Sequence, residues 1–362
     1  MENLTEYTDF EIKTTKINNG ILTLLSSKKY MSTTVENIEW NNKTVIARNV
    51  YNKDKTYKIV YSIIDSEGNV LNSYLENVGI LPRLFKNPDN ELYVSLTICH
   101  SDKDFEISVP LIERLAAKEQ KPNKEFAGEY IGNINQSSIF LDIDIFSEKK
   151  QDKMLNLEFK NGTVNKRHLV KIDFPKDNKM YIHNNEIHLL RNDLHRQIDE
   201  FGKELKKRKV KLDDYWCRAL LALSFEEESC FISDENGKIT LVIIEKTGKS
   251  KIKDLIDIKD EIFNMFQPVK IAEGLFVIVY NTEFGNGWFT LKDNNLIDFY
   301  YDKGGLGYKN LLTNEILKIG SNNLIINGIN KTAENGYAVV FSNNTKNPDK
   351  NTEIFILNKT IE

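Results

Sequence analysis

The chain has 362 residues, of which 40% are hydrophobic and 28% are charged, and its formal net charge is −4. A chain of this length can bury a large core, so disulfide bonds are not required for its stability. The negative net charge gives no general attraction to nucleic acid or to anionic lipid. No run approaches the roughly 18 apolar residues of a membrane span.

The features that report on the cellular compartment favour the cytoplasm. Residues 1–7 contain neither the basic segment nor the apolar segment of a secretory signal. The three cysteines, Cys99, Cys217 and Cys230, show no CxxC spacing, which is typical of reduced thiols in a reducing compartment. We therefore expect a cytoplasmic protein.

Strand-like runs of alternating apolar residues return along the chain, each followed by a turn rich in Asp, Asn and Gly. Glycine supplies the positive φ that such hairpin turns need. The turn glycines Gly162, Gly202 and Gly237 lie 40 and 35 residues apart. A period of about 40–50 residues is typical of a propeller blade with three or four short strands. The runs and their turns are 57–64 with 65–68, 154–159 with 161–162, 194–198 with 199–202, and 230–233 with 234–237.

Through these hairpins the chain resembles β-propeller repeat proteins in general. It lacks the recurrent Trp-Asp and Gly-His pairs of WD repeats and the recurrent paired glycines of kelch repeats, so the resemblance names no specific family. The resemblance implies an all-β propeller with about seven blades. A pair of β-sandwiches and an α+β fold are the alternatives.

We expect residues 1–362 to form a single β-propeller domain, because no Pro- or Ser-rich linker interrupts the chain. Strand-like runs lie near both ends, and they predict that N- and C-terminal strands close the ring in one shared sheet. These runs are 10–13, 21–25 and 353–357. Three segments break the strand pattern, and we expect one or two short helical insertions among them. The segments are 108–121, 213–228 and 253–267.

Four of the five histidines, His168, His183, His188 and His195, fall in one stretch. Imidazole is a common zinc ligand, but no cysteine pair and no HExxH spacing accompanies these residues. Residues five apart on one strand also point to opposite faces, which separates His183 from His188. We therefore predict ordinary inter-strand or surface histidines, no metal site and no cofactor.

The segment 203–211 contains six basic residues in nine. One interpretation is a patch for an anionic partner. The other is a solvated edge strand whose charges protect it against aggregation. Because the charges of such a strand would lie on both faces, the sequence favours the solvated edge.

The segment 283–288 provides the candidate ligand-binding residues Glu283, Asn286 and Trp288. It looks like a turn, and an exposed tryptophan in a loop offers a stacking surface for a sugar or a peptide. The nearby segment 302–307 is rich in glycine, but it lacks the complete P-loop and dinucleotide fingerprints, so it is interpreted as a loop.

No nucleophile elbow or metal-binding cysteine pair appears, and no catalytic residue can be assigned. The sequence favours a non-catalytic binding or scaffold protein that uses loops on one propeller face. The alternative is a hydrolase or lyase that acts on a carbohydrate or small anion at the central channel. We expect a monomer with a protein or carbohydrate ligand and with neither nucleic acid nor membrane as a partner.

Overall fold

The computed structural model of the chain describes residues 10–17, 20–27, 31–51, 57–65, 67–76, 80–98, 104–110, 128–142, 153–160, 163–172, 179–183, 185–191, 193–212, 215–265, 268–305, 307–319, 324–332, 336–343 and 352–361. These residues form strands, turns and loops, and no helix occurs among them. The chain divides into two compact units. The terminal unit comprises Met1–Leu84 with Asp260–Glu362, and the middle unit comprises Phe85–Lys259.

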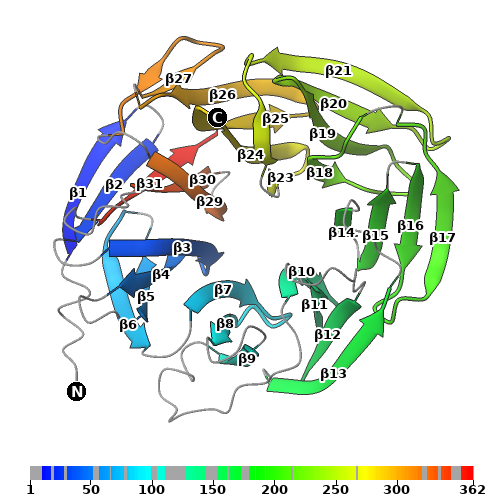
Figure 1. Cartoon of the computed structure of the whole chain (residues 1–362), viewed down its shortest axis with the longest axis horizontal. Coiled ribbons are helices and arrows are strands. Elements are labelled where there is room, and N and C mark those ends of the chain that lie inside the picture. The colour runs from blue at the N-terminus through cyan, green and yellow to red at the C-terminus, as the bar shows by residue number, and fades with distance from the viewer. Residues whose placement is uncertain are drawn as a thin grey trace. The chain divides into compact units, whose positions relative to one another are not determined.

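The described part of the terminal unit contains three antiparallel sheets (Figure 1). The first, in spatial order, is β1 (Phe10–Ile17), β2 (Gly20–Ser27), β31 (Thr352–Thr360), β30 (Gly336–Asn343) and β29 (Leu324–Thr332). The second is β3 (Met31–Trp40), β4 (Lys43–Tyr51), β5 (Tyr57–Ile64) and β6 (Val70–Glu76). The third is β22 (Ile262–Met265), β24 (Leu275–Thr282), β25 (Gly285–Lys292), β26 (Asn295–Lys303), β27 (Tyr308–Asn310) and β28 (Ile316–Leu317), with β23 (Val269–Ala272) also paired to β24.

In the middle unit the described residues form three four-stranded antiparallel sheets. They are β10 (Gly128–Ile134), β11 (Ser137–Asp142), β12 (Lys153–Lys160) and β13 (Thr163–Lys171); β14 (Lys179–His183), β15 (Glu186–Arg191), β16 (Leu194–Ile198) and β17 (Glu204–Lys209); and β18 (Ala219–Ala222), β19 (Ser229–Glu235), β20 (Lys238–Ile244) and β21 (Ser250–Asp257). A three-stranded sheet contains β7 (Ile80–Lys86), β8 (Leu92–Ile98) and β9 (Asp104–Pro110), and the division between the units falls inside β7.

The fold is an all-β propeller. In its four-stranded sheets each strand pairs with the next one along the chain, which is the blade arrangement of propellers. Five of the described sheets have the four or five strands of a regular blade, so the regular blades number five rather than the predicted seven or so. The sheets with three and with seven strands depart from the repeat. The spacing of the turns in the sequence is too irregular to show that the sheets differ in their number of strands.

The predicted helical insertions are wrong wherever the structure describes them. Within 213–228 the described residues form β18 and the loops on either side of it. The run Ala219 to Leu221 is buried throughout, which is typical of a strand that is covered on both faces. Within 253–267 the described residues belong mainly to β21 and β22. Residues 108–110 end β9, and 111–121 lie outside the described residues.

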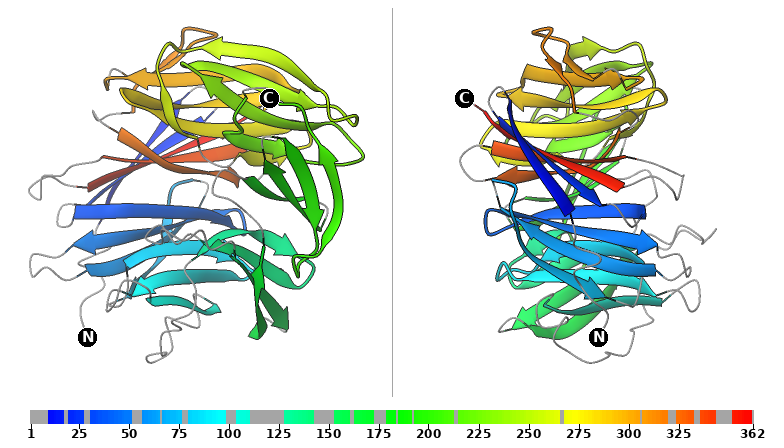
Figure 2. Two further views of the ribbon diagram at one scale, coloured as in Figure 1. Left: turned by 45° about the vertical axis from the view of Figure 1, so that its right-hand side comes forward. Right: turned by 90° about the vertical axis from the view of Figure 1, so that its left-hand side faces the viewer.

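The strand-like runs near the two ends of the chain meet in one sheet. β2 pairs antiparallel with β31, from Gly20 opposite Lys359 to Ser27 opposite Thr352. On its other side β31 pairs with β30. Figure 2 shows the blue N-terminal strands beside the red C-terminal strand. β31 is therefore an interior strand of its sheet, which explains why its run from Ile354 to Leu357 is buried on both faces.

The Asp and Gly residues of the predicted hairpins act as expected. Asp65 accepts hydrogen bonds from the Gly68 and Asn69 backbone N–H groups at 3.1 and 2.8 Å, which closes the β5–β6 turn. The β19–β20 turn consists of Asn236 and Gly237, whose φ angles are 51° and 82°. Residues 161–162, the predicted turn between β12 and β13, lie outside the described residues.

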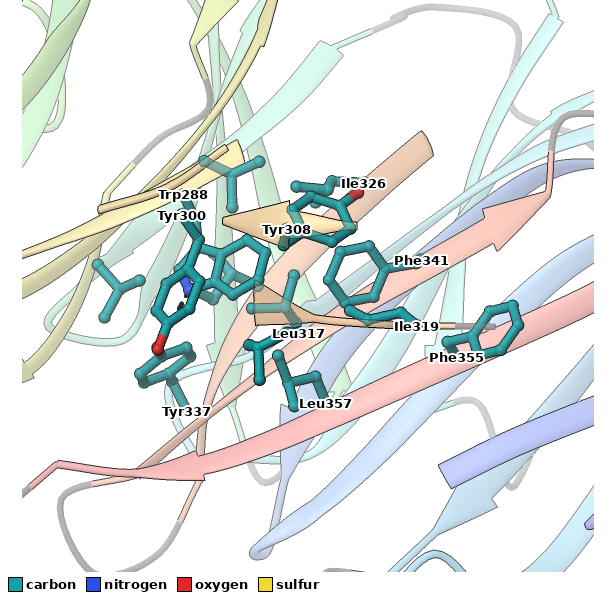
Figure 3. Close-up of a cluster of buried hydrophobic side chains, with 14 of the residues drawn as sticks. Trp288, Tyr300, Tyr308, Leu317, Ile319, Ile326, Tyr337, Phe341, Phe355 and Leu357 are labelled. Atoms are coloured by element: carbon teal, nitrogen blue, oxygen red, sulfur yellow. Dashed lines mark hydrogen bonds between the residues drawn. The ribbon is translucent and has the colours of Figure 1, made fainter. Parts of the chain in front are cut away.

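The largest hydrophobic cluster of the terminal unit joins its first and third sheets (Figure 3). Trp288 of β25 and Tyr300 of β26 pack there with Tyr337 and Phe341 of β30 and with Leu357 of β31. The Trp288 and Tyr300 rings are stacked, with centroids 4.7 Å apart and planes 16° apart. This aromatic core supports the hairpin that carries the predicted ligand residues.

Candidate functional site

Trp288 is not an exposed loop residue, so the sequence interpretation of its surroundings is wrong. It lies inside β25 opposite Val279, its side chain is fully buried, and its Nε1 donates to the Tyr337 hydroxyl at 3.1 Å. The glycines beside it were mistaken for turn residues. A Cβ atom on Gly287 would lie 2.1 Å from the Tyr300 carbonyl oxygen, so this glycine is needed for close packing within the sheet.

Asn286 also has a structural attachment. Its Nδ2 donates to the Leu324 carbonyl oxygen at 2.6 Å, and its Oδ1 accepts a hydrogen bond from the Tyr308 hydroxyl. The side chain thus connects β25 to β27 and to β29. A ligand would have to displace these bonds in order to use the amide.

The turn between β24 and β25 consists of Glu283 and Phe284, and both side chains are exposed. The Phe284 side chain is 57% exposed. The sequence pointed to Glu283 correctly as a surface turn residue but placed the turn too late. The alternating run of β24 ends at Thr282 and that of β25 starts at Gly285, which leaves two residues between them.

The base of this turn is held by a buried polar group. The Thr282 Oγ1 accepts a hydrogen bond from the Gly285 backbone N–H at 2.9 Å and lies 2.8 Å from Asp260 Oδ2. The Tyr301 hydroxyl donates to the same Asp260 oxygen. Burial, together with this hydrogen bond, raises the pKa of Tyr301 to about 12. The phenol thus stays a donor at neutral pH, and the turn is fixed before any partner arrives.

The glycine loop lies against the exposed turn. The Gly304 backbone N–H donates to the Phe284 carbonyl oxygen at 3.3 Å, and Lys303 Nζ lies 5.5 Å from the centroid of the Phe284 ring. No atom lies within 4 Å of the position that a Cβ on Gly304 would occupy. We call Glu283, Phe284, Lys303 and Gly304 the Phe284 surface. It combines a large apolar side chain, one charge of each sign and open space on a fixed turn.

Two of the clustered histidines form a relay in the middle unit. Arg208 Nε donates to His195 Nδ1 at 3.1 Å, and His195 Nε2 lies 2.9 Å from His188 Nδ1. Since His195 accepts at Nδ1, its proton lies on Nε2 and is donated to His188. The remaining N–H of His188 faces a carboxylate oxygen of Glu186 at 3.3 Å without hydrogen-bond geometry. Both imidazoles are therefore neutral.

Burial explains this neutral state. The side chains of His188 and His195 are 1% and 0% exposed, and Phe225 stacks on His195 with ring centroids 4.2 Å apart. Desolvation lowers the pKa of His188 to about 4. Desolvation and the Arg208 charge lower the pKa of His195 to about 3.

Arg208 connects this relay to the next sheet. Its guanidinium donates to the Ser224 carbonyl oxygen at 2.7 Å, to Ser229 Oγ at 3.1 Å and to the Lys246 carbonyl oxygen at 3.2 Å. The sheet β14–β17 is thereby attached to the sheet β18–β21. We interpret the relay as a structural connection, because its polar atoms are directed at one another rather than at solvent.

A second buried polar cluster lies in the terminal unit. Lys359 Nζ donates to the Tyr300 hydroxyl at 2.6 Å, and this hydroxyl donates to Glu315 Oε2 at 3.1 Å. Asn310 Nδ2 donates to Asp298 Oδ1 at 2.8 Å in the same region. Desolvation lowers the pKa of Lys359, while the charges of Asp298 and Glu315 oppose this shift. A buried amine bonded to a phenol is the arrangement here that most resembles an acid–base pair.

Metal binding has no support from the described residues. No group of three or more His, Cys, Asp or Glu side chains among them is placed to hold a metal ion. The described parts of the chain also contain no helix that is long and apolar enough to cross a membrane. The predictions of no metal and no cofactor stay predictions.

Comparison with known proteins shows the fold. No protein-family model matches the chain, and no curated protein sequence matches it. Among solved structures, prolyl oligopeptidase B from Galerina marginata is 9% identical with a TM-score of 0.51, over 93% of this chain and 56% of that protein.

Two other solved structures match nearly their whole length. A catalytically inactive virginiamycin B lyase from Staphylococcus aureus, solved with quinupristin, is 12% identical with a TM-score of 0.48, over 96% of this chain and 99% of that chain. The β-propeller domain of Cps50 (Swd1) from Myceliophteria thermophila is 10% identical with a TM-score of 0.48 and the same coverages. At these identities no activity or ligand follows for this chain.

Proposed function

We propose that the chain is a non-catalytic binding or scaffold protein that contacts a protein partner through the Phe284 surface. The observation that carries this proposal is the exposed Phe284 on a turn whose base is fixed by Thr282 and Asp260. A fixed turn loses little conformational freedom on binding. Less of the free energy gained by burying the ring is therefore offset by the entropy cost of ordering the turn.

A protein partner fits this surface better than a carbohydrate. Stacking against a sugar ring requires an open aromatic face, and the Trp288 ring predicted for this purpose is buried. Lys303 Nζ lies over the Phe284 ring, so one face of this ring is occupied by an ammonium group and is not open to a sugar. An apolar side chain flanked by a carboxylate would contact both Phe284 and Lys303.

Peptide selection tests the proposal. Peptides from a displayed random library are selected on the intact protein, and their affinity is measured for Phe284→Ala and Lys303→Glu. Leu71→Ala serves as the matched control, because Leu71 is similarly exposed on β6. We expect binding to weaken about tenfold or more in the first two variants only. Selected peptides whose affinity does not depend on Phe284 would contradict the proposal.

We also propose that residues 1–362 form one propeller domain. The pairing of β2 with β31 supports a ring that is closed by strands from both ends. A single domain unfolds in one cooperative transition, measured identically by circular dichroism and by tryptophan fluorescence. Two separated transitions would argue for two domains.

A hydrolase or lyase is the second candidate, and the Lys359–Tyr300 pair is the observation that favours it. A screen of glycoside, ester and small-anion substrates would be run with the wild type, Tyr300→Phe and Phe284→Ala. Turnover that is lost in Tyr300→Phe and kept in Phe284→Ala would establish this alternative. The binding proposal predicts no turnover in any of the three proteins.

A further inference from the structure

The edge strands β13 and β17 of the middle unit carry an excess of positive charge. The residues 163–171 contain no acidic side chain, and 203–211 contain only Glu204. The net charge of the whole chain is nevertheless −4. We define the basic edge as the exposed side chains Lys166, Arg167, Lys171, Lys203, Lys207 and Lys209.

The two strands form one continuous surface. The Phe201 ring, in the turn that leads into β17, lies edge-on against His168 of β13 with ring centroids 5.5 Å apart. A Cβ atom on Gly202 would lie 2.6 Å from Val170, so the turn and β13 are in close contact. The basic side chains of the two strands therefore belong to adjoining parts of the surface.

Part of this charge is compensated by neighbours, since Lys166 pairs with Glu158 at 3.4 Å. Glu204 binds Arg196 at 2.8 Å and Lys207 at 3.3 Å, which offsets the repulsion of two cations that lie directly opposite each other. Lys171 and Lys209 form no ion pair with any other described residue, and both are exposed. Like charges that lie close together repel one another and lower the stability of the folded chain. Their presence therefore calls for an explanation other than stability.

Protection of sheet edges does not explain the excess. Lysine is a common means of protecting an edge strand, but β21 is an edge strand of the same unit with charges of both signs. β6, an edge strand of the terminal unit, contains no basic residue and only one acidic residue. A predominantly basic edge is thus a property of β13 and β17 and not a requirement of the fold.

We propose that the basic edge binds an acidic, extended peptide segment of a protein partner. Among the described strands, β17 pairs only with β16, so its other side is open to an added strand up to Lys209, whose carbonyl oxygen is in close contact with Gly248. Leu169 and Leu205 are 54% and 49% exposed among the cations, so apolar side chains of the peptide also find contacts. Nucleic acid fits less well, because two aromatic rings beside these strands are already engaged: Phe201 packs against His168, and Phe225 stacks on His195.

This inference is independent of the proposed contact at Phe284, and different variants test the two. The probe is a fluorescent peptide of alternating Glu and Val residues, titrated into the intact protein at low and at physiological salt. The test variant is K171E/K207E/K209E. The matched control is K249E/K253E, which reverses charges of exposed residues in and next to β21. A single-stranded oligonucleotide and vesicles containing phosphatidylserine are titrated in parallel.

We expect the peptide to bind the wild type and the control alike, with an affinity that falls as salt rises. The test variant should bind about tenfold more weakly or worse while its melting temperature stays within a few degrees of the wild type. Equal peptide binding by both variants would overturn the inference. Tighter binding of the oligonucleotide or the vesicles than of the peptide would overturn it in favour of that other class of partner.

Discussion

The two buried polar clusters, one in each unit, stabilise neighbouring sheets with different chemistry. In the terminal unit the Lys359 amine is bonded to Tyr300 and accompanied by two carboxylates, so opposite charges lie close together. In the middle unit His188 and His195 are kept neutral beside Arg208. The comparison teaches that burial can be combined with opposite charges that lie close together, whereas a pair of desolvated imidazoles is stable only while both rings stay neutral.

Removal of β31 should have the largest effect, because it takes Lys359 out of the terminal cluster and an interior strand out of its sheet. Deletion of Thr352–Glu362 exposes the edges of β2 and β30, which carry apolar side chains. We expect loss of the monomer to aggregation, measured by size-exclusion chromatography, and a lower melting temperature. A truncated chain that stays monomeric with an unchanged melting temperature would show that the end pairing is dispensable.

Trp288→Ala breaks the aromatic support of the same cluster. It removes the ring stacked on Tyr300 and leaves a cavity, so the free energy of unfolding should fall by about 3–5 kcal/mol. Phe284→Ala, four residues earlier in the chain, should change it by about 0.5 kcal/mol or less. Denaturant titrations of both variants check the difference, and equal losses would refute the assignment of one ring to the core and the other to the surface.

Arg208→Gln breaks the middle cluster and should cost about 2–3 kcal/mol, since buried acceptors of two sheets lose a charged donor. The neighbouring residues in the same strand provide the control. The side chains of Lys207 and Lys209 are exposed, so replacing either by Gln should not lower the free energy of unfolding by a comparable amount. A loss below about 0.5 kcal/mol for Arg208→Gln would mean that the connection between the sheets does not depend on the guanidinium.

Acid should weaken the same cluster without any mutation. The pKa values of His188 and His195 in the folded chain, about 4 and about 3, lie below that of an unfolded histidine near 6.5. The unfolded chain therefore binds more protons, and the stability present above pH 6.5 is lost as the pH falls towards 4. Between pH 7 and pH 5 the loss attributable to the pair should be on the order of 4 kcal/mol, about half of it from each histidine.

Urea titrations at pH 7 and pH 5 measure this loss. In His188→Gln/His195→Gln the stability is expected to depend less on pH, even where the double variant is less stable overall. An unchanged pH dependence in that variant would assign the acid sensitivity to other groups.

The smallest effect is expected for the lysines beside Arg208. Neutralising Lys206, Lys207 and Lys209 to Gln should change the free energy of unfolding by about 0.5 kcal/mol or less for each residue. Thermal denaturation checks this value. A large loss would show that the exposed ion pairs of Lys206 with Glu226 and of Lys207 with Glu204 contribute more to stability than surface pairs usually do.

Several features of the molecule could be predicted from local sequence because their causes are local. The turn at Asp65 and the one at Asn236-Gly237 depend on side chain to backbone hydrogen bonds and on positive φ, which a few residues supply. The apolar run at 353–357 likewise predicted a strand, and it lies inside β31. Repeated hairpins of this kind were enough to indicate an all-β propeller.

Other features were decided by the tertiary structure, because they depend on contacts that are distant in sequence. Trp288 packs in a core built from several strands, where Tyr337, 49 residues away, accepts its N–H, and position 287 requires glycine because the Tyr300 carbonyl leaves no room for a Cβ. His188 and His195 meet because β15 and β16 pair in a register that places them diagonally. Sequence alone determined the repeated hairpins with their Asp, Asn and Gly turns, whereas strand register and sheet packing decided which side chains are buried, which are neutral and which remain at the surface.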